Sequence, residues 1–291
     1  MPDRLLVQIS DTHVVADGLL HDRVDSAGQL AAVLAGLGGT GHRPDAVLLT
    51  GDLADHGRPE EYQRLRQLLD AFRRRTGIPV ILLPGNHDDR DHFRSALLDD
   101  AGSGPLDQVH WVGGLRVVAL DTTVPGAHHG ALADGQLDAL AAELALPAPE
   151  GTIVALHHPP IPSPVRLVNL LSLREPERLA AVIAGRDVLM VLAGHAHHTS
   201  AGLLGGVPVW VATATAYQAD LRAASDLLRG IPGCGYTRVD VAGGRAVASQ
   251  VATAFGQPCV YEHPLAGLEA RLAGLGAERV AGGAPGRTGT A

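Results

Sequence analysis

Short apolar runs alternate with longer amphipathic stretches along most of this chain. Five runs are rich in Val, Ile and Leu and apolar on both faces: Leu5–Ser10, Ala46–Thr50, Val80–Leu83, Thr152–Leu156 and Val188–Ala193. Strands with this pattern are buried on both sides, as in parallel sheets. The stretches between them predict helices at about Ser26–Leu37, Arg90–Leu98, Asp134–Leu144 and Glu175–Ala184.

The clearest helix follows the second apolar run. It begins at Pro59, which suits the first turn of a helix, and three arginines precede Gly77 at its end. Its apolar residues recur at helical spacing and predict a buried stripe of Tyr62, Leu65, Leu69 and Phe72. The arginines are therefore interpreted as a helix end and not as a patch for nucleic acid.

Two antiparallel hairpins are predicted beside these alternating units. They cover Val109–Leu120 around Gly113–Gly114 and Tyr236–Val251 around Gly243–Gly244. An α/β chain that mixes parallel units with hairpins predicts two sheets packed face to face with helices outside. The pattern contains no repeat and no linker, so we expect a single domain over residues 1–263. The Gly-, Ala- and Arg-rich residues 264–291 predict a flexible tail.

Composition narrows the class of protein. The chain has 291 residues, 46% of them apolar, and a formal net charge of −8. The acidic balance argues against a nucleic-acid partner. The N-terminal residues enter a strand without the pattern of a secretory leader, and no apolar run is long enough to span a membrane. We therefore expect a cytoplasmic protein.

The candidate chemistry lies where the five apolar runs end, in the sequences ISDTH, LTGD, LPGNHD, LHHPP and LAGHAH. These endings supply Asp11, His13, Asp52, Asn86, His157 or His158, His195 and His197. In an α/β sheet, ligands bind beyond the carboxyl ends of the strands, so residues far apart in sequence can converge there. The pattern predicts a hydrolytic site with two metal ions.

The ligand types restrict the metal. Carboxylate, amide oxygen and imidazole without thiolate suit Mn, Fe, Zn or Co. Asp52 follows Gly51, and its two carboxylate oxygens can bind two cations at once, so Asp52 is the candidate bridge. Periodicity does not decide between His157 and His158.

The motifs D-x-H, G-D, G-N-H-D, H-x-P and G-H-x-H occur in this order and resemble those of the calcineurin-like metallophosphoesterase family, over about residues 5–255. The resemblance implies a four-layer α-β-β-α sandwich of two mixed β-sheets flanked by helices. It also implies two ligand sets. One metal would take Asp11, His13, Asp52 and His197, and the other Asp52, Asn86, His157 and His195, with His157 chosen from the family's H-x-P motif.

Further stretches look closer to the class III cyclic-nucleotide phosphodiesterases, in particular their mycobacterial type. They read RPDAVLLTGDLADHG, GNHDDR, LDTTVPGAHHG and LHHPPIPS. This likeness implies a cyclic nucleotide such as cAMP as the substrate and allows a homodimer. The metals would be two divalent or mixed-valence ions, Fe/Mn or Mn/Mn, with Zn or Co as options.

The expected mechanism uses the metal pair directly. Two cations lower the pKa of a shared water, and the bridging hydroxide attacks phosphorus in line with the leaving oxygen. His87, next to Asn86, is placed to contact a phosphate oxygen or to protonate the leaving group. Asp55 and Asp88 are interpreted as residues that orient His87 or a ligand histidine. His129 is a weaker candidate for the substrate cleft.

Two other functions remain open at this point. The first is a phosphomonoesterase or phosphodiesterase of the same family that acts on other small phosphoesters. The second is a binding scaffold with an inactive or metal-free site. The presence of every expected ligand residue argues against the scaffold.

Overall fold

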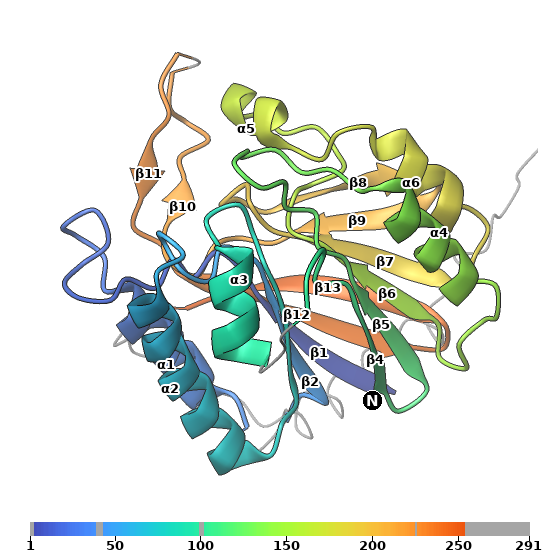
Figure 1. Ribbon diagram of the computed structural model, residues 1–291, viewed down its shortest axis with the longest axis horizontal. Coiled ribbons are helices and arrows are strands. Elements are labelled where there is room, and N and C mark those ends of the chain that lie inside the picture. The colour runs from blue at the N-terminus through green and yellow to red at the C-terminus, as the bar shows by residue number, and fades with distance from the viewer. Residues whose placement is uncertain (1–2, 39–42, 99–101, 225, 254–291) are drawn as a thin grey trace, which may run out of the picture. The chain divides into compact units, whose positions relative to one another are not determined.

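Two mixed β-sheets carry the fold in the computed structural model, which describes residues 3–38, 43–98, 102–224 and 226–253 (Figure 1). The first sheet has the strand order β13-β12-β1-β2-β3. Its strands are β1 (Arg4–Ile9), β2 (Ala46–Thr50), β3 (Val80–Leu83), β12 (Gly235–Ala242) and β13 (Arg245–Ala252). Strands β1, β2 and β3 run parallel, whereas β12 pairs antiparallel with both β1 and β13.

The second sheet has the order β4-β5-β6-β7-β9-β8. Its strands are β4 (Gln108–Val112), β5 (Leu115–Ala119), β6 (Thr152–Ala155), β7 (Val188–Ala193), β8 (Ser200–Leu204) and β9 (Val207–Val211). Its central strands β5, β6, β7 and β9 are parallel, and β4 and β8 close the two edges antiparallel. A separate small hairpin pairs β10 (Gln218–Ala219) with β11 (Gly230–Ile231).

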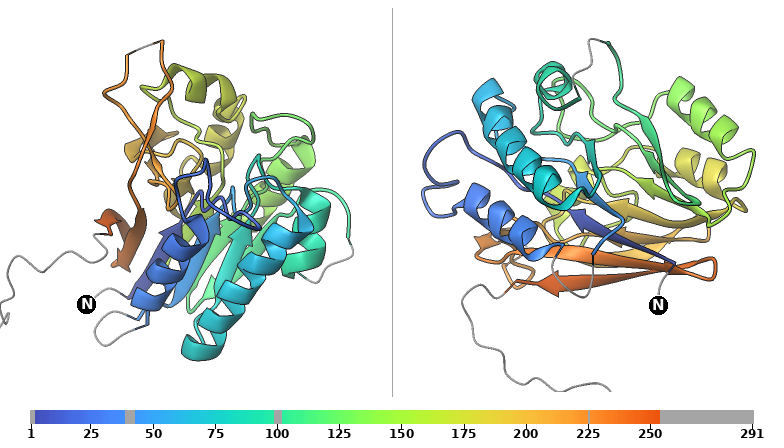
Figure 2. Two further views of the ribbon diagram at one scale, coloured as in Figure 1. Left: turned by 90° about the vertical axis from the view of Figure 1, so that its left-hand side faces the viewer. Right: turned by 90° about the horizontal axis from the view of Figure 1, so that it is seen from below.

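Helices cover the outer face of each sheet. The first sheet carries α1 (Ser26–Gly36), α2 (Pro59–Thr76), α3 (Arg90–Phe93) and a π-helical turn, η1 (Arg94–Leu98). The second carries α4 (Asp134–Glu143), α5 (Arg166–Leu171) and α6 (Pro176–Ile183). Figures 1 and 2 show α1 and α2 on one side of the paired sheets and α4 and α6 on the other. The predicted α-β-β-α sandwich is confirmed.

Alternate residues of the central strands face different layers. Val7 and Val47 pack against the helices of the first sheet, whereas Leu6 and Leu48 pack between the two sheets. The second sheet faces the same central layer with residues such as Val117. Because both faces of these strands are buried, their sequences are mostly apolar and do not alternate between apolar and polar residues.

The predicted stripe of α2 is buried as expected, and Gly77 ends the helix in the left-handed conformation. The predicted helix at Arg90–Leu98 is one α-helical turn followed by the π-helical turn. The pattern did not predict five elements: α5, the two strands of the β8–β9 pair and the two strands of the β10–β11 hairpin. Pro208 interrupts the apolar run of β9, which is why that strand was not predicted.

No helix in the described part of the chain is long and apolar enough to cross a membrane. The described residues of the expected catalytic domain end at Thr253. The predicted boundary at residue 263 and the predicted tail 264–291 lie outside the described residues.

Candidate metal centre

The carboxyl ends of β1, β2, β3, β6 and β7 meet where the two sheets adjoin. Backbone hydrogen bonds join the segments after β1 and β2, since Asp11 N donates to Gly51 O (3.0 Å) and His13 N donates to Asp52 O (2.9 Å). Side chains join the two sheets. The amide of His195 donates to both carboxylate oxygens of Asp11 (3.0 and 3.1 Å). The edge is therefore a single polar site with contributions from both sheets.

Four predicted ligand residues form one tight group. The ligand atoms of Asp11, His13, Asp52 and His197 all lie within 4.8 Å of one another. Nε2 of His13 lies 3.1 Å from Nε2 of His197 and 3.7 Å from Oδ2 of Asp52. All four residues are buried. Two carboxylates and two imidazole nitrogens that face one point make a suitable set for a divalent metal.

The remaining candidate ligands are Asn86, His157 and His195, and His157 also contacts Asp52. Nε2 of His157 is 3.3 Å from the same Oδ2 of Asp52. The rings of His157 and His195 are 5.2 Å apart between centroids. Oδ1 of Asn86 is buried without a hydrogen-bond partner among the described residues, and the buried Nε2 of His157 has only its contact with Asp52. Buried polar atoms of this kind are expected where a ligand completes the site. One oxygen of Asp52 thus faces both groups of nitrogen ligands.

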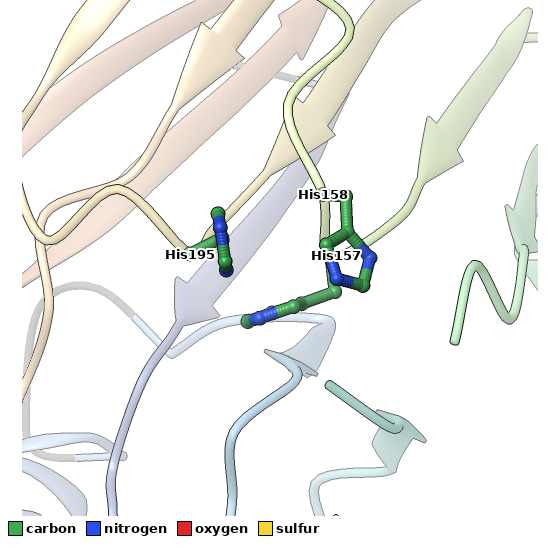
Figure 3. Close-up of side chains that lie close together, drawn as sticks. All are labelled: His157, His158 and His195. Atoms are coloured by element: carbon green, nitrogen blue, oxygen red, sulfur yellow. The ribbon is translucent and has the colours of Figure 1, made fainter. Parts of the chain in front are cut away.

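His157 and His158 are both buried, and their contacts differ. His157 points Nε2 toward Asp52, whereas Nδ1 of His158 is hydrogen-bonded to Oγ1 of Thr122 (2.7 Å). The ligand atoms of His157, His158 and His195 nevertheless lie within 4.8 Å of one another, and Figure 3 shows the three rings gathered at the tips of β6 and β7. The contact with Asp52 favours His157 as the ligand.

Hydrogen bonds at Nδ1 fix how three of these imidazoles present their other nitrogen. Nδ1 of His157 faces the carbonyl oxygen of Thr50 (2.8 Å), and Nδ1 of His197 faces that of Tyr217 (3.1 Å). Nδ1 of His13 faces the carboxylate of Asp55 (3.0 Å). Because each Nδ1 donates its proton to oxygen, each Nε2 faces the site and offers its lone pair there once it is deprotonated.

Charge and burial divide the histidines into two classes. Burial lowers the pKa of His157, but the adjacent Asp52 carboxylate outweighs it and raises that pKa to about 9. Burial also opposes ionisation of Asp52, yet His157 and His13 hold the pKa of its carboxyl well below the usual range. Burial and neighbouring histidines lower the pKa of His195 and of His197 to about 3. Burial raises the pKa of the Asp11 carboxyl. The site therefore combines an ionised Asp52 with a protonated His157 and with neutral imidazoles at His195 and His197.

The backbone is unusual at the same residues. Five of the predicted ligands adopt positive φ angles between 41° and 70°: Asp11, His13, Asp52, His195 and His197. Asp and His tolerate this left-handed region better than most residues, although it costs of order 1 kcal/mol at each. A side chain on Gly51 would overlap the ring of His157. The strained backbone at these residues and the close packing at Gly51 thus help to bring the candidate ligand side chains together.

A cavity of about 850 Å³ opens onto this cluster. Its polar end is lined by His13, Asp52, Asn86, His87, His195 and His197. Other walls come from the loop before α1, from α5, and from the segment around β11. The volume falls in the range of roughly 300–1,000 Å³ that encloses a small organic ligand.

Comparison with known proteins shows the family of this chain. Residues 5–199 match the family described as calcineurin-like phosphoesterase. The chain belongs to this family. It is 48% identical to a probable cyclic nucleotide phosphodiesterase of Rhodococcus erythropolis, over 76% of this chain and 73% of the relative. It is 47% identical to a cAMP/cGMP dual specificity phosphodiesterase of Mycobacterium tuberculosis, over 80% of this chain and 74% of the relative.

A solved member of this fold is the purple acid phosphatase PPD1 from yellow lupin (Lupinus luteus) seeds. The two structures superpose with a TM-score of 0.61 at 14% identity, over 88% of this chain and 52% of the phosphatase. At this identity the likeness concerns the fold alone. The phosphoesterase fold, with Asp and His residues positioned for two metals, is therefore the framework of this chain.

His87 lies at the phosphoesterase site beside the ligand residues. Its amide donates to Oδ1 of Asp52 (2.8 Å), and its Nδ1 is 2.7 Å from the carbonyl oxygen of Asp55. The side chain is 38% exposed and lines the cavity. The position fits the predicted contact with substrate, and the carboxylate of Asp55 orients His13 rather than His87.

Two weaker predictions differ from the structure. No histidine in the described part of the chain forms a hydrogen bond with Asp88; its carboxylate accepts from the amides of Leu53, Ala54 and Gly85 and from the hydroxyl of Tyr62. It therefore braces the backbone on either side of the site. His129 does not line the cavity described above, whereas its neighbour His128 does and lies 3.4 Å from Nδ2 of Asn86.

Sequence reasoning missed Tyr217 in this phosphoesterase. Its ring packs 4.4 Å from that of His197 between centroids, its carbonyl accepts from the same histidine, and it lines the cavity. It lies outside the five strand endings, so no ligand motif indicated it. The only sequence signal was an aromatic residue at the end of the small-residue run ATATAY.

Proposed function

We propose that this chain is a metal-dependent phosphodiesterase that hydrolyses cyclic nucleotides such as cAMP. The observation that carries the proposal is the position of Asp52. A single carboxylate oxygen lies 3.7 Å from Nε2 of His13 and 3.3 Å from Nε2 of His157, between two groups of ligand atoms. Membership of the phosphoesterase family and the names of the two relatives support the reaction class and the substrate.

The proposed ligand sets follow from this division. Asp11, His13, Asp52 and His197 would hold one metal, and Asp52, Asn86, His157 and His195 the other. The buried Oδ1 of Asn86, which has no hydrogen-bond partner among the described residues, and the buried Nε2 of His157, which faces Asp52, fit the second set. When bound, two such cations lower the pKa of water and neutralise charge on the phosphoryl oxygens.

His87 supplies the remaining chemistry from the protein. The carbonyl of Asp55 holds Nδ1, so a neutral imidazole places its proton there and a protonated one also offers Nε2–H to the cavity. A donor at this position can bind a phosphate oxygen or deliver a proton to the leaving oxygen. The hydrogen bond from the amide of His87 to Asp52 holds His87 beside the place where the phosphate of the substrate would bind.

Three further features remain predictions. The ligand chemistry suits Fe/Mn or Mn/Mn, with Zn or Co as options, because oxygen and imidazole donors do not select one of these ions. A homodimer and a cytoplasmic location rest on the sequence resemblance and the sequence pattern. The broader alternative, a phosphomonoesterase or phosphodiesterase for other small phosphoesters, uses the same centre.

A substrate panel with Mn²⁺ tests the proposal. The purified chain is assayed on 3',5'-cAMP, 3',5'-cGMP, 2',3'-cAMP, a glycerophosphodiester and a phosphomonoester. We expect the highest kcat/KM for a cyclic nucleotide. We also expect a loss of at least about 100-fold in His87→Ala, which removes a donor to the phosphoryl group, and in Asp52→Ala, which removes the carboxylate that would hold both metals. Equal or better turnover of the monoester would contradict the proposed substrate, and full activity of Asp52→Ala would contradict the proposed centre.

A further inference from the structure

One wall of the cavity is apolar, and side chains from two short peripheral segments form it. Leu167 and Leu171 project from α5. Leu228 and Ile231 come from the arm, which we define as β10, β11 and the described residues between them. Figure 1 shows α5 and the arm rising beside one another beyond the strand tips.

These side chains are more exposed than ordinary core residues. Leu167 is 42% exposed and Leu228 is 66% exposed, although both line a cavity whose other end is charged. Clustered exposed apolar groups on a cavity wall are typical of a ligand-binding surface, because covering them removes apolar area from water.

The volume of the cavity gives the size of the ligand. A phosphate group bound beside His87 at the metal cluster would occupy only the polar end, whereas the cavity measures about 850 Å³ and extends to α5 and the arm. A substrate that fills it must carry a sizeable group with apolar faces attached to its phosphate.

We infer that the wall formed by Leu167, Leu171, Leu228 and Ile231 binds the nucleobase of the substrate. The inference rests on the proposed function and adds the part of the site that selects nucleotides over phosphodiesters without a base. A purine has two flat apolar faces that aliphatic side chains can cover, and glycerol offers none.

Local bonds hold both segments without using the metal ligands. In the arm, Asp220 forms ion pairs with Arg222 (3.2 Å) and Arg229 (2.6 Å). Beside α5, Asn169 exchanges two hydrogen bonds of 2.7 Å with the backbone of Ser163. A change in an apolar side chain of the wall should therefore alter substrate binding and leave the metal centre intact.

Neighbouring leucines provide matched controls. Leu171→Ser and Leu228→Ser each remove an apolar side chain from the wall. Leu170→Ser and Leu227→Ser remove one from the same segment, at positions that are 56% and 60% exposed and do not line the cavity. All four variants of the full chain are compared with the unchanged chain after loading with Mn²⁺.

The readouts are KM and kcat for 3',5'-cAMP and the inhibition constants of adenosine 5'-monophosphate and inorganic phosphate. We expect Leu171→Ser and Leu228→Ser to raise KM and the constant for adenosine monophosphate about five- to tenfold, as loss of an aliphatic contact does. The constant for phosphate and kcat should change less than about twofold, and the two controls should match the unchanged chain.

Two results would overturn the inference. One is an unchanged KM for cAMP in both wall variants. The other is equal affinity of the unchanged chain for adenosine monophosphate and for phosphate, measured by calorimetry, and this result counts whether or not cyclic nucleotides are turned over. The two proposals can also be told apart. If the unchanged chain does not turn over cyclic nucleotides but prefers adenosine monophosphate to phosphate, and the wall variants lose this preference, the proposed function is contradicted and the nucleobase wall is supported.

Discussion

At the scale of single residues, glycine precedes a candidate ligand at three strand tips. Gly51 precedes Asp52, Gly85 precedes Asn86, and Gly194 precedes His195. A side chain on Gly85 would overlap the amide and Oδ1 of Asp52, and its Cβ would lie 2.8 Å from Cε1 of His157. The missing side chains let segments from both sheets approach closely enough for their ligands to share one site.

Gly85→Ala should therefore weaken Mn²⁺ binding at least about tenfold, a size typical of changes that misplace metal ligands. Isothermal titration of the metal-free chain with Mn²⁺ measures the affinity. Gly135→Ala is the matched control, since a side chain there, in α4, meets no atom within 4 Å. Equal Mn²⁺ affinity in both variants would contradict this explanation of the glycine.

The charge state of His157 gives a second prediction at this scale. Burial alone would lower its pKa, but Asp52 raises it to about 9 in the metal-free chain. Folding therefore favours the protonated form of His157. The resulting contribution to the free energy of unfolding is fully present below the ordinary pKa near 6.5 and is lost as pH rises through 9. A metal needs the lone pair of Nε2, so binding must displace the proton.

We expect Mn²⁺ binding at pH 7.5 to release about one proton from this histidine and the affinity to rise between pH 6.5 and 9. Calorimetric titrations in buffers of different ionisation enthalpy count the protons released. His157→Gln should release fewer. Binding without proton release and without pH dependence would show that His157 is not a ligand.

At the scale of elements, the strands buried on both faces were predictable, whereas α5 and the arm were not. The runs at Ala46–Thr50 and Val188–Ala193 are apolar throughout because they are buried on both faces, and this pattern appears directly in the sequence. The helix α5 has six residues, and the strands of the arm have two each, too short for a periodic pattern to show.

The residues of the candidate site likewise include some that the sequence could predict and some that it could not. Motif spacing indicated the ligand residues because Asp, Asn and His after buried strands are chemically distinctive. It misassigned Asp88, since a carboxylate beside a histidine in sequence can bind backbone amides instead, and here it accepts from three of them. Tyr217 was not predictable because its role depends on stacking against His197 across the fold.

The left-handed backbone at His195, just after β7, leads to a prediction about stability. His195 has φ 70°, where Gly is favoured over Ala by about 1 kcal/mol. In chelator, His195→Gly should therefore have a higher free energy of unfolding than His195→Ala by about this amount. Urea denaturation followed by circular dichroism measures the difference.

The neighbouring residue is the control for this comparison. Ala196 is not among the residues with positive φ, so Ala196→Gly should lower the free energy of unfolding instead. A His195→Gly variant no more stable than His195→Ala would contradict the idea that the ligand position is strained.

At the scale of the whole molecule, the candidate centre joins the two sheets. The first sheet supplies Asp11, His13, Asp52 and Asn86, and the second supplies His157, His195 and His197. Either proposed metal would therefore contact residues from both sheets. Such ions would bind the folded chain and not the separated segments, so metal binding and folding should be coupled.

The most direct test is the number of Mn²⁺ ions that bind per chain at saturation, measured by equilibrium dialysis with metal analysis. We predict two ions for the unchanged chain, one for Asn86→Ala, which removes a ligand of the second metal only, and two for the control His129→Ala. One ion or none in the unchanged chain, or two in Asn86→Ala, would contradict a dinuclear centre that shares Asp52.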